Sequence, residues 1–93
     1  MAKLWTPEEY KIAHELYEDA LAKIGLGQPV KRNTYVQIGA SRMKRTEGSL
    51  RWLFGNMTVA REELGIPTAS IFGRADHRAE KLVDWYRSQL VTG

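Results

Sequence analysis

The spacing of apolar residues along the chain predicts a small all-α domain built from four amphipathic helices. In four segments, apolar side chains recur every three or four positions, which is the repeat expected when one face of a helix is buried. Stretches that contain glycine and proline follow the first and third segments, and the short turn Lys44–Thr46 separates the second from the third. We therefore expect a single domain over residues 1–93, with helices at about 6–24, 34–43, 47–64 and 76–90.

The first helix has clear signals at both ends. Thr6, Pro7 and Glu9 have the spacing of a capping box with proline at the first helical position. Gly25 and Gly27 predict its end, because glycine readily adopts the conformations that terminate helices. We expect the acidic outer face of this helix to point away from any nucleic acid; that face carries Glu8, Glu9, Glu15, Glu18 and Asp19.

The second segment is compatible with two structures. Asn33 can cap a short helix here. The run from Tyr35 to Ile38 also favours a strand, and Gly39 destabilises a helix by about 1 kcal/mol relative to alanine. A short strand at 34–38 is therefore the alternative to the helix.

The later segments contain three features that bear on their folding. Gly55 and Asn56 interrupt the third helix, which we expect to kink or split there, with Asn56 as a buried hydrogen-bonding residue. Phe72, with its neighbour Ile71, is expected to anchor the loop that follows. Asp76 can cap the last helix. The apolar faces of these helices predict inward positions as far as Leu64 and Leu90.

Charge is distributed unevenly along the chain. The segment 31–51 contains six basic residues and one acidic residue, or +5, whereas the other residues contain eight bases and ten acids, or −2. Such a basic segment can neutralise phosphates and release their counterions. It coincides with two predicted helices and the short turn between them, an arrangement found in many DNA-binding proteins. The predicted DNA-binding residues are Lys31, Arg32, Arg42, Lys44, Arg45, Thr46, Ser49, Arg51 and Trp52.

These residues differ in what they offer to a nucleic acid. The bases of the loop and the turn suit phosphates, whereas Arg51 also suits a guanine edge. The hydroxyls of Thr46 and Ser49, with the backbone N–H groups at the start of the third helix, suit a phosphate. The simpler interpretation is a solvated basic face on which Thr46 only caps a helix. For Trp52, packing against another helix is favoured over exposure as a stacking platform for a base.

Several classes of protein lack support in the sequence. The chain has no cysteine, which excludes disulfides and thiolate chemistry and fits a reducing cytoplasm. It has no apolar run long enough to span a bilayer. His14 and His77 have no partners at metal-ligand spacing, and no nucleotide-binding loop is present. We therefore expect a cytoplasmic protein that is not an enzyme and needs no cofactor or metal.

Three blocks of the sequence, in order, match a known pattern. They are Arg45–Leu50, the pair Gly55-Asn56, and Glu63–Pro67, and the opening Trp5–Glu9 is similar as well. With these blocks the chain resembles the N-terminal DNA-binding head of bacterial HNH endonucleases, including modification-dependent restriction enzymes of the McrA type. The resemblance implies a DNA-binding head, but the chain has no HNH nuclease motif, so it does not imply cleavage. The DNA-binding residues that this resemblance implies are Arg45, Thr46 and Ser49, in the block Arg45–Leu50, and Arg51, which directly follows it.

The leading hypothesis is a DNA-binding module without catalytic activity, such as the recognition head of a restriction-type nuclease. Its expected partners are double-stranded DNA and a nuclease domain, either linked to the chain or separate. One alternative is a protein-interaction module in which Trp52 and Trp85 anchor an acidic partner. The other is a small homodimeric transcriptional regulator with its two-fold interface on the last helix.

Overall fold

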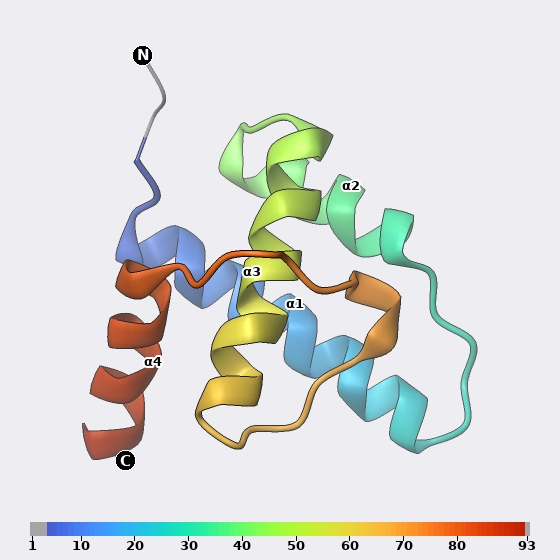
Figure 1. The fold of residues 1–93 in the computed structure, drawn as a ribbon. Helices are drawn as coiled ribbons and strands as arrows, with labels where there is room; N and C mark the ends of the chain where they lie inside the picture. The colour runs from blue at the N-terminus through green and yellow to red at the C-terminus, as the bar shows by residue number, and fades with distance from the viewer. Residues whose placement is uncertain (1–3, 93) are drawn as a thin grey trace.

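The computed structural model describes residues 4–92, with side chains as far as Leu90, and these residues form four α-helices and one short 3-10 helix (Figure 1). No strand occurs among them, so the predicted all-α class is confirmed and the alternative strand at 34–38 is wrong. Helix α3 is central and contacts every other element. The elements are α1 (Pro7–Gly25), α2 (Arg32–Met43), α3 (Glu47–Glu63), η1 (Ser70–Phe72) and α4 (Glu80–Thr92).

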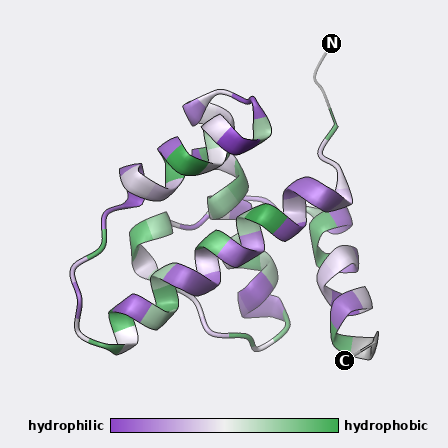
Figure 2. Ribbon diagram, turned by 180° about the vertical axis from the view of Figure 1, so that it is seen from behind, coloured by the Kyte–Doolittle hydropathy of each residue, from purple (hydrophilic) through white to green (hydrophobic). Residues whose placement is uncertain are grey.

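Helix α1 begins at the predicted capping box. The Oγ1 atom of Thr6 accepts from the Glu9 N–H at 3.2 Å, and the Glu9 carboxylate accepts from the Thr6 N–H at 2.9 Å. Two N–H groups that would lack helical partners are thereby bonded. Hydrophilic and hydrophobic residues alternate along α1 (Figure 2), and its inner face includes the fully buried Ala13, Tyr17 and Ala20.

A turn of three residues joins α2 to α3. Lys44 ends α2 in the left-handed conformation, with φ of 55°, and the Arg45 N–H donates to the Ala40 carbonyl at 3.0 Å. Thr46 then caps α3 by accepting from the Ser49 N–H at 3.1 Å. The prediction that Asn33 caps α2 is wrong, because the helix begins at Arg32 and its N-cap residue is Lys31.

Gly39, which the sequence suggested as a weak point of α2, allows this helix to approach its neighbours closely. A Cβ atom at Gly39 would lie 2.6 Å from Cδ1 of Leu50 in α3 and 3.4 Å from Cδ1 of Leu16 in α1. Both leucines are buried, so neither has free space into which to move. The low helix propensity of glycine is offset here by contact among three helices.

The predicted split of α3 at Gly55 and Asn56 is wrong, because α3 is continuous from Glu47 to Glu63. The glycine instead lies beneath the segment 73–79, which crosses in front of α3 on its way from η1 to α4 (Figure 1). The Ala75 N–H donates to the Gly55 carbonyl at 3.1 Å, and a Cβ atom on Gly55 would lie 3.4 Å from the Ala75 nitrogen. This crossing explains why the last helix begins at Glu80 rather than near Asp76, as predicted.

Aromatic rings fill the centre of the core. Phe72 of η1 is buried and lies with its ring centroid 4.6 Å from that of Phe54 and 4.5 Å from that of Tyr17, so its predicted role as an anchor is confirmed. The inward face predicted for the last helix extends too far, because Leu90 is 56% exposed. None of the helices described is both long enough and apolar enough to cross a lipid bilayer.

Candidate nucleic-acid interface

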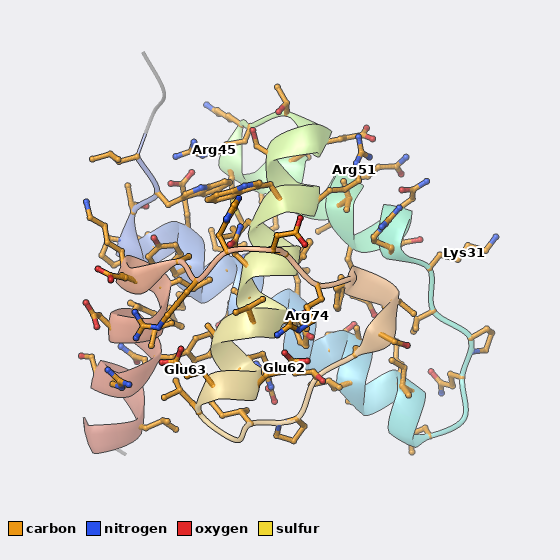
Figure 3. All side chains as sticks on the ribbon, viewed as in Figure 1. Lys31, Arg45, Arg51, Glu62, Glu63 and Arg74 are labelled. Atoms are coloured by element: carbon orange, nitrogen blue, oxygen red, sulfur yellow. The ribbon has the colours of Figure 1, made fainter. Side chains whose placement is uncertain are left out.

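Four of the predicted DNA-binding residues are exposed cations at the two ends of α2. We call Lys31, Arg32, Arg42 and Lys44 the α2 basic surface; no carboxylate in the described part of the chain lies within ion-pair distance of them. Figure 3 shows the Lys31 side chain extending into solvent. Positive charge at a helix N-terminus opposes the helix dipole, so Lys31 and Arg32 do not stabilise α2. These cations are therefore available to an anionic partner.

Arg45 is engaged inside the protein, unlike the residues of the α2 basic surface. Its Nε atom lies 2.6 Å from Oε2 of Glu9, and its Nη2 atom donates to Oε1 of Glu9 and to the Leu4 carbonyl, each at 2.8 Å. The guanidinium also stacks on Trp5, 3.9 Å from the ring centroid. Hydrogen bonding by Arg45 lowers the pKa of Glu9, against the effect of burial. Arg45 thus clamps the N-terminal segment onto the turn between α2 and α3.

The start of α3 carries hydroxyl groups that bond to each other. The Oγ atoms of Thr46 and Ser49 lie 2.8 Å apart, and Thr46 also accepts the Ser49 N–H. Arg51 lies on the next turn, where its Nη1 atom is 3.8 Å from Oε1 of Glu47, with both side chains about half exposed. Such an exposed pair contributes about 0.2–1 kcal/mol at most, so Arg51 can leave Glu47 for a stronger anionic partner.

Trp52 is exposed, and the prediction that it packs against another helix is wrong. Its side chain is 52% exposed, although its carbonyl accepts a hydrogen bond from Nδ2 of Asn56 at 2.8 Å. Asn56 is only 1% exposed, which confirms the prediction that it is a buried hydrogen-bonding residue. Helix α3 therefore presents an aromatic side chain to solvent directly beside Arg51.

Two hollows meet at Trp52. The first hollow has a volume of about 610 Å³ and lies between the N-terminal segment and the start of α3. The second hollow, of about 380 Å³, lies between α2, α3 and the crossing segment. Besides Trp52, the first is lined by Trp5, Lys44, Arg45, Thr46, Gly48 and Ser49, and the second by Arg32, Arg51, Gly55 and residues 72–77.

The structure adds two parts to this region that the sequence did not predict. Trp5, which lines the first hollow, was not among the predicted DNA-binding residues. A tryptophan directly before a helix cap is nevertheless a recognisable signal for local packing. The crossing segment 73–79 brings Asp76 and His77 to the second hollow, and no local pattern indicated that placement. Within residues 4–92, no group of three histidine or acidic side chains is arranged to hold a metal ion.

Comparisons of the chain with family models, with curated proteins and with solved structures found no match. The resemblance to the endonuclease head therefore rests on the sequence blocks alone and stays a prediction.

Proposed function

We propose that this protein is a DNA-binding module without catalytic activity of its own. It contacts double-stranded DNA through the α2 basic surface, Thr46 and the first turns of α3. The observation that carries the proposal is the placement of unpaired charge. Four exposed cations without acidic partners lie at the two ends of α2, the helix that leads into α3, whereas the cations Lys23, Arg61, Arg74, Arg78 and Arg87 are paired with carboxylates.

The contacts divide between the phosphate backbone and the bases. The α2 basic surface neutralises phosphates, which contributes affinity but no sequence information. Two helices joined by a three-residue turn have the form of a helix-turn-helix, whose second helix contacts base edges with its N-terminal residues. Arg51 is suited to that role, since a guanidinium can bind the O6 and N7 atoms of guanine together. The middle of α3 is covered by the crossing segment, so only its start can enter a groove.

The wider assignment, as the recognition head of a restriction-type nuclease, rests on the sequence blocks described above. It makes a linked or separate nuclease domain the expected partner. One feature of the fold is consistent with this assignment. The block Arg45–Leu50 includes the exposed start of α3, and the pair Gly55-Asn56 lies in the middle of α3, at the crossing segment.

The proposal is tested by measuring duplex affinity over a series of salt concentrations. With four phosphate contacts, a plot of log K against log salt should have a slope between about −3 and −5. Fluorescence anisotropy of a labelled duplex of about 20 base pairs provides the readout. A slope near zero would overturn the proposal.

Two neighbouring residues provide a matched pair of variants. Lys44→Gln should make the slope shallower by about 1, because it removes one phosphate contact. Arg45→Gln should leave the slope unchanged, since the guanidinium faces Glu9 rather than solvent. Circular dichroism confirms that each variant is folded before binding is measured. If Arg45→Gln makes the slope shallower by as much as Lys44→Gln does, the assignment of the phosphate contact to Lys44 rather than Arg45 is wrong.

A further inference from the structure

Trp52 occupies a position that suits stacking better than groove reading. Its indole ring is half exposed, and it lines both hollows. Tryptophan has one hydrogen-bond donor and no acceptor, so it distinguishes base edges poorly. Its flat apolar surface is instead suited to the π-face of a base, and base–aromatic stacking is tolerant of sequence.

The lining of the first hollow matches an occupant that is aromatic and anionic. Two indoles, from Trp5 and Trp52, form part of its wall, and Lys44 supplies a cation without an acidic partner. None of the described residues that line this hollow carries a carboxylate. Its volume of about 610 Å³ lies within the roughly 300–1,000 Å³ of typical ligand clefts.

The clamp described above fixes one wall of this hollow. The guanidinium of Arg45 stacks on Trp5 and is bonded to both oxygens of Glu9. Trp5 is thereby held on the same side of the molecule as the turn between α2 and α3. The hollow is thus preorganised, which lowers the entropic penalty of binding.

We propose that the first hollow receives one unpaired nucleotide of the bound DNA, with its base stacked on Trp52 and its phosphate beside Lys44. This inference rests on the proposed DNA-binding function. The nucleotide is unpaired because neighbouring bases cover both π-faces of a base inside a duplex. The adjoining backbone runs past Arg51 and Arg32, which line the second hollow on the other side of Trp52.

Three duplexes of otherwise identical sequence test this proposal. One is fully paired, one has a single-nucleotide bulge, and one has an abasic bulge at the same place. The abasic bulge keeps the flexibility of the site but has no base to stack. We expect the nucleotide bulge to bind more tightly than the abasic bulge by roughly 5- to 150-fold, the range that stacking of one base provides.

Variants at Trp52 identify the residue responsible. Trp52→Ala should abolish the preference for the nucleotide bulge over the abasic bulge while duplex binding keeps its salt dependence. Trp52→Phe should retain part of that preference, because phenylalanine still stacks. Trp85→Phe is the matched control, since Trp85 packs against Tyr10, His14 and Tyr86 away from both hollows.

The outcomes separate this inference from the proposed function. Equal affinity for both bulges overturns the stacking site, even if salt-dependent duplex binding is observed. An equal loss on all three duplexes with Trp52→Ala also overturns it, because Trp52 would then contact paired DNA. A salt slope near zero on every duplex overturns the DNA-binding function itself.

Discussion

At the scale of single residues, His14 and Arg61 form a polar centre between α1, α3 and α4. Arg61 has no exposed surface; its Nε atom donates to the Pro67 carbonyl at 2.7 Å, and its Nη2 atom pairs with Glu18. Its Nη1 atom donates to Tyr86 and lies 3.3 Å from Nδ1 of His14. Because arginine can only donate, this contact requires that Nδ1 carry no proton. Protonation of His14 would place a second positive charge against Arg61.

This geometry predicts that acid destabilises the protein through His14. Burial lowers the pKa of His14 below its ordinary value of 6.5; Glu18 opposes that shift and Arg61 adds to it. As the pH falls below about 6.5, His14 binds a proton more readily in the unfolded chain than in the folded protein. The free energy of unfolding therefore falls over this interval. Urea denaturation at pH 7.5 and at pH 5.5 measures this change.

Two histidine variants make the measurement specific. His14→Gln should flatten the dependence of stability on pH over that interval, because glutamine does not titrate. His77→Gln serves as the control, since His77 is exposed in the crossing segment, and it should keep the dependence. If His14→Gln has the same pH dependence as the unmodified protein, the acid sensitivity arises elsewhere.

The sequence predicts some of these residues and misses others for a common physical reason. Asn56 was predicted as a buried hydrogen-bonding residue, and its Nδ2 atom donates to the Trp52 carbonyl, although its buried Oδ1 atom has no partner among the described residues. Arg61 was missed, although it lies four residues after Met57 on the buried face of α3, because a charged side chain is rarely fully buried without partners. Those partners come from α1, α4 and the loop after α3, and no local pattern could place them.

At the scale of elements, helix ends follow local signals, whereas the contacts between elements do not. The bounds of α1 and α3 agree with their caps and glycines to within one residue. The clamp between Glu9 and Arg45 joins residues 36 positions apart, and the crossing segment joins Ala75 to Gly55. Only the folded arrangement brings these partners together. For this reason, the sequence analysis did not predict that Arg45 pairs with Glu9 of α1.

The clamp should stabilise the protein measurably. Its two side chains are only 10% and 13% exposed, so removing one partner leaves a largely buried charge. We expect Arg45→Met and Glu9→Gln each to lower the free energy of unfolding by about 2 kcal/mol. The double variant should lose less than the sum of the two, and a double-mutant cycle from urea denaturation measures that coupling. Strict additivity would show that the two side chains act independently.

The same pair makes a prediction about pH that is separate from that of His14. The pKa of Glu9 is lowered, so the folded state favours its ionised form. This stabilisation is present above the ordinary glutamate pKa of 4.5 and is lost as the pH falls further. The free energy of unfolding should therefore fall in two stages as the pH is lowered, first below about 6.5 through His14 and then below about 4.5 through Glu9 of the clamp.

At the scale of the whole molecule, the location of charge matters more than its total. The net charge is only +3, and most basic side chains outside α2 are paired with carboxylates. Lys11 on α1 and Lys81 on α4 are exposed cations away from the α2 basic surface, and no carboxylate of residues 4–92 pairs with them. They allow a comparison in which the net charge changes equally but the place of the change differs.

Two double variants make that comparison. Arg32→Gln with Lys44→Gln, and Lys11→Gln with Lys81→Gln, each lower the net charge from +3 to +1. All four side chains are exposed, so the free energy of unfolding should change by no more than about 0.5 kcal/mol per substitution. The first variant should make the salt slope of duplex binding shallower by about 2, because two phosphate contacts are lost, whereas the second should leave it unchanged. Equal losses in both would mean that DNA responds to the overall charge of the protein and that the α2 basic surface has no special role.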